Sequence, residues 1–159
     1  MTLDWCVTSP DPETTRRFGE LLGRLSEPGD VVALEGPLGV GKTALVQGLA
    51  LGLGLDSGTP VTSPTFTLVG EYPTDPPLRH ADFYRVESER RLEEAGFDDL
   101  LDGRGVVVVE WAERFPLALP PDRLWIQLRF GRESSRHLNV RAEGPRAEGR
   151  LRRLVEHWA

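Results

Sequence analysis

The sequence predicts an α/β protein, a single domain over residues 1–159 in which helices flank a mixed central sheet. Residues 31–34 and 106–109 are short runs that are apolar throughout, which is typical of strands buried on both faces of a parallel sheet. A helix is expected after each of them. Residues 124–130 alternate between apolar and polar side chains, which is typical of a strand with one buried face. Together these patterns predict a parallel core with an antiparallel extension.

The first half of the chain is expected to begin with a strand at residues 3–7. The prolines and acids of residues 9–13 are typical of a helix start, and the turn residues 28–30 are expected to end that helix. A second helix is expected from Lys42 to about Leu51, because apolar residues recur there at helical spacing before two glycines.

The second half of the chain is expected to be richer in strands. Residues 59–64 cannot form regular structure, because two prolines interrupt them. The remaining expected elements are strands at 65–72 and 78–84, a short helix at 88–95, a strand at 138–141 antiparallel to 124–130, and a terminal helix at 147–158.

Composition narrows the function classes. A chain of 159 residues with 39% hydrophobic and 28% charged residues is typical of a globular domain with a real core. The formal net charge of -6 argues against coating nucleic acid through bulk charge. After Pro121, however, nine arginines outnumber five acidic residues. The favoured interpretation is a solvated face, and the alternative is a docking surface for an acidic partner or RNA.

Cys6 is the single cysteine, so it forms no internal disulfide, and we expect it to be a small core residue. The N-terminal residues lack the basic and apolar regions of a signal peptide, and no run approaches the length of a membrane span. We therefore expect a cytoplasmic protein that does not contact a membrane.

Residues 36–43 match the pattern G-x-x-x-x-G-K-[ST] of a phosphate-binding loop. Glycines bring the main chain close to phosphate, successive N–H groups form an anion nest, and the following helix adds about half a positive charge at its N-terminus. The loop also follows a buried strand and opens a helix, as this mechanism requires. It predicts a nucleoside triphosphate bound with magnesium. The residues expected to hold the nucleotide are Pro37, Leu38, Gly39, Val40, Gly41, Lys42 and Thr43.

Carboxylates follow two of the expected strands. Glu110 ends the apolar run at 106–109, a position from which an acid can bind magnesium beside a phosphate loop. His80, Asp82 and Tyr84 share one face of the expected strand 78–84. Either this is the exposed face of an edge strand, or Asp82 lies near the γ-phosphate and orients water or a magnesium ligand. Because imidazole does not suit magnesium, His80 is interpreted as a hydrogen bonder.

Three further features bear on the site. The hydroxyl-rich residues 62–67 are either simple turn chemistry or a segment that senses the γ-phosphate. Trp111, beside Glu110, is either a core or interface aromatic or a wall of the site. Lys42 is the only lysine, so the Asn-Lys-x-Asp segment that recognises guanine in folds of this class cannot exist, and adenine is favoured.

In combination these segments resemble the TsaE (YjeE) family of small bacterial P-loop ATPases. The resemblance covers about residues 12–115 and rests on TRRFG at 15–19, LEGPLGVGKT at 34–43, VTSPTFTLV at 61–69, HADFYR at 80–85 and EWAE at 110–113. The family usually has Asp-Leu-Gly-Ala-Gly-Lys-Thr in the loop, whereas this chain has Pro37 and Val40, and Pro37 removes one N–H from the nest.

The resemblance implies a P-loop NTPase-like fold and a slow, partner-regulated, magnesium-dependent ATPase. It would act with TsaD and TsaB to form threonylcarbamoyladenosine beside the anticodon, meeting tRNA only through the complex. Thr43 and Glu110 would bind magnesium. Asp82, Lys42 and Thr65 would serve hydrolysis, with residues 63–65 as a switch. Thr15 would lie near the adenine, and Arg136, with Arg132 as a rival, would reach the nucleotide.

Two other functions remain open at this level. A P-loop kinase of a small metabolite would carry an arginine-bearing lid, which Arg90 and Arg91 could imitate. A nucleotide-gated binding module would use the same loop without essential turnover.

Overall fold

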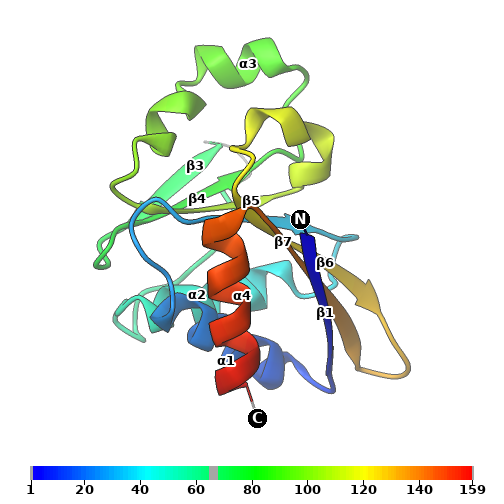
Figure 1. Cartoon of the computed structure of the whole chain (residues 1–159). Helices are drawn as coiled ribbons and strands as arrows, with labels where there is room; N and C mark the ends of the chain where they lie inside the picture. The colour runs from blue at the N-terminus through cyan, green and yellow to red at the C-terminus, as the bar shows by residue number, and fades with distance from the viewer. Residues whose placement is uncertain (1, 65–67, 159) are drawn as a thin grey trace.

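In the computed structural model, seven strands form one mixed sheet in the order β1-β7-β6-β2-β5-β4-β3 (Figure 1). The structure describes residues 2–64 and 68–158. Strand β2 (Val31–Glu35) lies at the centre, parallel to β5 (Val106–Glu110) on one side and to β6 (Arg123–Phe130) on the other. Strand β4 (Leu78–Asp82) continues the parallel core beyond β5.

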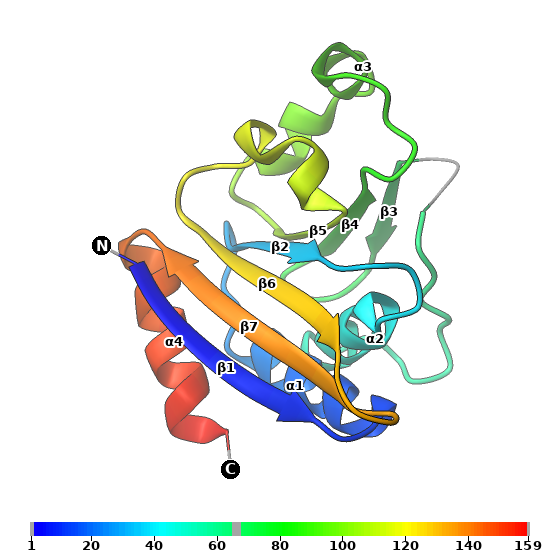
Figure 2. The same cartoon turned by 90° about the vertical axis from the view of Figure 1, so that its right-hand side faces the viewer.

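The antiparallel strands lie at the two ends of the sheet. Strand β7 (Arg136–Glu143) pairs with β6 and, on its other side, with β1 (Thr2–Ser9), as Figure 2 shows. Strand β3 (Val69–Tyr72) pairs with β4. The predicted parallel core, antiparallel extension and flanking helices are therefore confirmed.

Two strand boundaries near the site differ from the prediction. Of the strand predicted at 65–72, residues 65–67 lie outside the described residues and Leu68 is not in a strand, so β3 begins at Val69. The strand predicted at 78–84 ends at Asp82. The Asp82 carboxylate accepts the backbone N–H of Tyr84 at 2.8 Å, which turns the chain out of the sheet.

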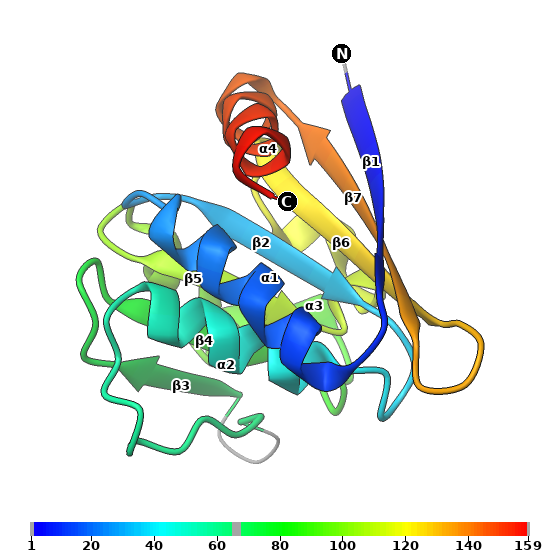
Figure 3. The same ribbon diagram turned by 90° about the horizontal axis from the view of Figure 1, so that it is seen from below.

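Three helices cover one face of the sheet: α1 (Pro12–Arg24), α2 (Lys42–Gly52) and α4 (Pro145–His157), as Figure 3 shows from below. Every second residue of the central strands points into the apolar core that they enclose, including Val32 and Val108.

The opposite face is covered only in part. A short helix, α3 (Glu89–Glu94), and three 3₁₀ turns, η1 (Phe97–Leu101), η2 (Ala112–Arg114) and η3 (Pro116–Ala118), close a second, smaller core over β2, β4 and β5. In the described chain no helix lies over this face of β1 and β7 (Figure 2). The exposed side chain of Cys6 lies on β1, so the prediction that it is a core residue is wrong. The described part of the chain contains no helix that is long and apolar enough to span a bilayer.

Helices α1 and α2 approach each other through glycines. A Cβ atom on Gly48 of α2 would lie 2.0 Å from the Arg16 carbonyl oxygen, and one on Gly19 of α1 would lie 2.2 Å from the Leu45 carbonyl oxygen. Contacts this short involve backbone atoms, which cannot rotate away. The glycines therefore fix how closely α2, and with it the loop that precedes α2, lies against α1.

We expect Gly48→Ala to lower the free energy of unfolding by about 1–3 kcal/mol, because the added methyl group has to separate the two helices. Gly149→Ala on α4 is the matched control, since a Cβ atom there meets nothing within 4 Å. A glycine replaced by alanine in a helix without a clash gains about 0.5–1 kcal/mol. Urea unfolding measures both changes, and equal effects at the two positions would contradict the close approach.

A buried ion-pair cluster attaches α4 to the start of β2. Asp30 is 5% exposed, and its carboxylate lies 2.7 Å from Arg146 Nε and 2.6 Å from an Arg150 guanidinium nitrogen. It also accepts the backbone N–H of Glu27 at 2.7 Å. The Arg150 side chain is almost fully buried, so the loss of its partner would leave a charge without compensation.

Asp30→Ala is therefore expected to cost about 3–5 kcal/mol of unfolding free energy. The control is Asp4→Ala, because the 3.0 Å pair of Asp4 with Arg141 is half exposed and should contribute about 0–1 kcal/mol. Both variants are compared by chemical unfolding at neutral pH. A loss below about 1 kcal/mol for Asp30→Ala would show that the cluster does not anchor α4.

Candidate nucleotide-binding site

The glycine-rich loop connects the end of β2 to the start of α2. A Cβ atom on Gly36 would lie 2.7 Å from the Leu128 carbonyl oxygen, so only glycine fits against β6. Gly39 and Gly41 have φ values of 76° and 115°, a conformation that L side chains rarely adopt. Gly41 is also the N-cap of α2 and provides no side-chain cap, so the first N–H groups of the helix stay directed into the loop.

Pro37 departs from the usual loop sequence and lacks an N–H, but its backbone carbonyl takes part in the loop. Its carbonyl oxygen accepts the Val40 N–H at 3.3 Å and the Lys42 ammonium at 3.4 Å. The side chain of Val40 is fully buried in the larger core. The loop thus keeps a turn that a backbone carbonyl closes, and the larger side chain of Val40 is accommodated in the core.

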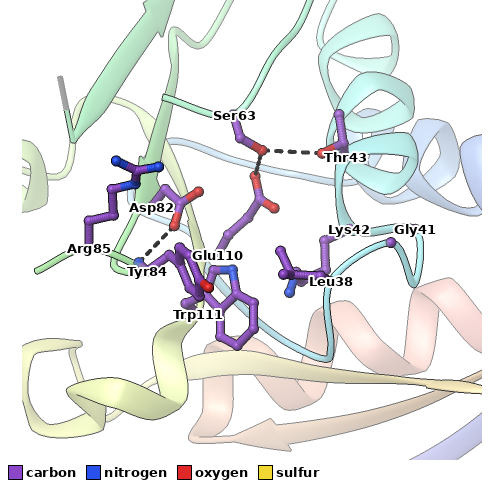
Figure 4. A pocket seen from close by; sticks show the side chains of 11 residues that line it. Leu38, Gly41, Lys42, Thr43, Ser63, Asp82, Tyr84, Arg85, Glu110 and Trp111 are labelled. Atoms are coloured by element: carbon purple, nitrogen blue, oxygen red, sulfur yellow. Dashed lines mark hydrogen bonds between the residues drawn. The ribbon is translucent and has the colours of Figure 1, made fainter. Parts of the chain in front are cut away.

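A cavity of about 470 Å³ opens beside this loop (Figure 4). It brings together the loop, the end of α2 nearest to it, and the segments that follow β4 and β5. The lining residues are Leu38, Gly39, Gly41, Lys42, Thr43, Ser63, Asp82, Tyr84, Arg85, Glu110 and Trp111. The cavity therefore brings the predicted loop residues 38–43 together with Asp82 and Glu110. Val40 is the one residue of that range that does not line it.

Lys42 is held inside the protein although it is charged. Its side chain donates to the carbonyl oxygens of Gly36 and Pro37, and its ammonium nitrogen lies 3.7 Å from the centre of the Trp111 ring. Burial lowers the pKa of Lys42, while the negative charges of Glu110 and Asp82 oppose that shift.

A chain of hydrogen bonds links the N-terminal turn of α2 to β5 and β4. Ser63 Oγ donates to Glu110 Oε2 at 2.7 Å and lies 3.2 Å from Thr43 Oγ1 (Figure 4). On the other side, the fully buried His80 places Nε2 2.5 Å from the same Glu110 oxygen. The interpretation of His80 as a hydrogen bonder agrees with this contact.

Glu110 is buried, and burial alone would raise its pKa. The hydrogen bonds from His80 and Ser63 and the charge of Lys42 outweigh burial and hold the pKa below its ordinary value. Glu110 is therefore an anion at neutral pH, directed into the cavity beside the Thr43 hydroxyl.

The oxygens of Thr43 and Glu110 fit a magnesium ion. Both lie within hydrogen-bond reach of the single Ser63 hydroxyl, and hydroxyl and carboxylate oxygens are the hard ligands that magnesium prefers. Within residues 2–64 and 68–158, no group of three or more His, Cys, Asp or Glu side chains could hold a metal ion. A magnesium ion here would thus need phosphate oxygens and water as further ligands, which is usual for this metal.

Asp82 lies directly opposite Glu110 in the register of β4 and β5 and is 6% exposed. Burial is the main cause that raises its pKa, and the charge of Glu110 raises it further. The alternative that His80, Asp82 and Tyr84 form the exposed face of an edge strand is wrong, because β4 lies between β3 and β5 and ends before the half-exposed Tyr84.

The remaining predicted residues lie outside the cavity lining. Thr15 is 1% exposed, and its hydroxyl bonds to Ser9 Oγ at 2.7 Å while its methyl group faces the loop at Gly41. Arg136 Nε donates to the Val40 carbonyl at 3.0 Å, so it supports the loop from outside. Arg132 is exposed in the turn between β6 and β7, and Thr65 lies outside the described residues.

Three wall residues were missed or only partly anticipated from the sequence. Trp111 lies in the cavity wall, one of the two interpretations that its position beside Glu110 allowed. Tyr84 and Arg85 also line the cavity. The sequence signal that could have placed them there is their position shortly after Asp82. The ring of Tyr84 lies 4.7 Å from the ring of Trp111, so two aromatic side chains form one wall.

Fold and site together define a small α/β protein with a glycine-rich loop facing two buried carboxylates. The family model for the threonylcarbamoyl adenosine biosynthesis protein TsaE matches residues 9–138. The TsaE protein of Bacillus subtilis strain 168 is 40% identical over 148 residues, 92% of this chain and 91% of that protein. The TsaE protein of Treponema pallidum is 42% identical over 135 residues, 85% and 98% of the two chains.

The chain therefore belongs to the TsaE family, which acts in the biosynthesis of threonylcarbamoyladenosine in tRNA. The crystal structure of Bacillus subtilis YdiB has the same fold, with a TM-score of 0.82, 34% sequence identity, and coverage of 99% of this chain and 97% of that one.

The raised pKa of Asp82 predicts a pH-dependent cost to stability. Below the ordinary aspartate pKa of about 4, the group is neutral in both the folded and unfolded states and costs nothing. Above its raised folded pKa, the charged form is penalised only in the folded state. Asp82→Asn should therefore raise the free energy of unfolding at pH 7, and the gain should disappear as the pH falls towards 4.

Asp102→Asn should behave in the opposite way. The Arg79 guanidinium lies 2.7 Å from the Asp102 carboxylate and lowers its pKa, so this variant should lose stability at pH 7 and recover at low pH. Urea unfolding between pH 3 and pH 7 measures both profiles. If Asp82→Asn destabilises at pH 7, the burial cost assigned to Asp82 is wrong.

Proposed function

We propose that this protein binds ATP with magnesium, hydrolyses it slowly, and acts with TsaD and TsaB to form the threonylcarbamoyl group on the adenosine beside the tRNA anticodon. The observation that carries the proposal is one cavity in which Lys42 and Thr43 face Glu110 and Asp82. The family membership supplies the pathway. The proposal places the protein in the cytoplasm, with tRNA met through the complex.

Each group in the cavity has a distinct task in this proposal. The loop N–H groups and the N-terminus of α2 cradle the phosphates. Magnesium, when bound, would neutralise charge on the phosphates, and the oxygens of Thr43 and Glu110 would hold it. His80 orients the Glu110 carboxylate through its 2.5 Å contact.

Asp82 is the residue proposed to position the attacking water. Its carboxylate lines the cavity on the strand next to Glu110, and one oxygen is fixed by the Tyr84 N–H. Its raised pKa makes it a stronger proton acceptor than an ordinary aspartate. Thr65 and the switch role of residues 63–65 stay predictions, while Ser63 supplies the hydroxyl between Thr43 and Glu110.

Adenine is the proposed base because recognition of guanine in folds of this class requires a lysine in an Asn-Lys-x-Asp segment. Lys42 is the only lysine in the chain, and it belongs to the glycine-rich loop. Thr15 and Arg136 flank the glycine-rich loop from outside, so their roles near the nucleotide stay predictions. Slow turnover by the isolated chain fits a site that partner proteins complete.

The kinase alternative finds little support. Arg90 and Arg91, the candidate lid arginines, both lie within 3.6 Å of Glu94 on the exposed helix α3. This arrangement is typical of a solvated helix rather than of a phosphate-binding lid.

Lys42→Ala is expected to reduce ATP affinity at least about tenfold, because a charge-assisted bond to phosphate is worth about 1.5–3 kcal/mol. Arg129→Ala, which removes an exposed cation from β6, is the control and should leave the affinity unchanged. Calorimetric titration with magnesium and a non-hydrolysable ATP analogue measures both. Unchanged affinity in Lys42→Ala would overturn the proposed site.

Asp82→Ala separates hydrolysis from binding. We expect this variant to bind ATP normally but to lose hydrolysis by about 100-fold or more, the usual contribution of a positioned acid or base. Threonylcarbamoyladenosine formation with purified TsaD, TsaB and tRNA should fall in parallel. If modification continues without hydrolysis, the nucleotide-gated module is the better function.

A further inference from the structure

The ammonium group of Lys42 contacts three acceptors of the protein itself. An ammonium group has three N–H donors. The carbonyl oxygens of Gly36 and Pro37 and the face of the Trp111 indole are three acceptors around it, the last at 3.7 Å from the ring centre. A phosphate group can therefore reach Lys42 only if one of these acceptors is released.

The three acceptors differ in their freedom to move. Gly36 is wedged between β6 and Val40, where a Cβ atom would lie 2.7 Å from one and 2.9 Å from the other, so its backbone has no room to shift. The Pro37 carbonyl also accepts the Val40 N–H and belongs to a ring-restricted residue. Trp111 is only partly buried and its side chain faces the open cavity (Figure 4). The indole is the acceptor that can be released.

The backbone at Trp111 points to a positioned side chain. This residue has a φ of 58°, the left-handed conformation that a bulky L residue rarely adopts. Such strain persists where the surrounding structure requires it and is common at ligand sites. The conformation follows directly after β5 and directs the indole over Lys42, with the Tyr84 ring packed 4.7 Å away.

We propose that Trp111 is a gate residue whose indole holds the Lys42 ammonium group and has to release it when a triphosphate enters. The proposal rests on the proposed nucleotide binding. The indole competes with phosphate for the lysine, so it weakens triphosphate binding and favours nucleotide exchange. Trp111 acts through Lys42 as a positioning residue, and Tyr84 limits the rotation of the indole.

The test compares Trp111→Leu with the wild type by calorimetry, using magnesium tripolyphosphate and, separately, magnesium with a non-hydrolysable ATP analogue. Loss of the cation–π contact should tighten binding of both probes by about 5- to 30-fold, the range that corresponds to a partly or fully desolvated contact. Trp111→Phe keeps a weaker aromatic face, so its affinity for both probes should lie between those of the wild type and of Trp111→Leu. It also provides a reading if the leucine variant does not fold.

Trp125→Leu is the matched control. Its indole also carries a cation, the Arg123 guanidinium at 5.0 Å, but it lines a separate cavity with Glu35 and Gln127. Binding of both probes should be unchanged in this variant.

A spectroscopic reading follows the indole itself. In protein labelled with 5-fluorotryptophan, the resonance assigned by its absence in Trp111→Phe should shift when tripolyphosphate binds and should shift in Lys42→Ala without any ligand. The Trp125 resonance should stay in place in both cases. A Trp111 resonance that shifts neither on tripolyphosphate binding nor in Lys42→Ala would overturn the gate.

The outcomes separate the two proposals. Equal or weaker binding of both probes in Trp111→Leu overturns the gate while leaving nucleotide binding intact. Weaker binding of the ATP analogue alone shows that the indole contacts the base or ribose, which also overturns the gate. If neither the wild type nor Trp111→Leu binds either probe, the proposed nucleotide function fails, and the gate fails with it.

Discussion

The site depends on the parallel pairing of β2, β5 and β4. Parallel strands present their carboxyl ends at one edge of the sheet, and ligands of open α/β sheets bind at that edge. Glu110 ends β5, Asp82 ends β4, and the glycine-rich loop leaves the end of β2. A shift of β4 or β5 by one residue would turn its carboxylate to the other face of the sheet, away from the loop.

The same edge concentrates buried charge. Lys42, Asp82 and Glu110 are each at most 6% exposed, and burial opposes the charged form of all three. The attraction of Lys42 to the two carboxylates opposes that cost, and at Glu110 it outweighs the cost together with the His80 and Ser63 hydrogen bonds. Stability comes from elsewhere: from the cores on both faces of the sheet, from the glycine contacts between α1 and α2, and from the ion pairs of Asp30.

Much of the fold could be predicted from local patterns. The apolar runs of β2 and β5 show burial on both faces, and the alternation in β6 shows its inward side. Strand order was not predictable in the same way. That β6 lies parallel to β2, and that β1 pairs with β7 at the edge, depends on contacts between residues far apart in the chain. Cys6 illustrates the difference, because its exposure follows from the position of β1 and not from its own chemistry.

The sequence by itself determined the parts of the site that are contiguous in the chain. The glycine spacing of residues 36–43, the acid after an apolar run and the segment around Asp82 each have a local physical signature. Only the tertiary structure decided which groups face one another. Ser63 lies between Thr43 and Glu110, His80 holds that carboxylate, and Trp111 covers Lys42. These contacts join separate elements, and a distance between elements is set by how they pack, which no single segment encodes.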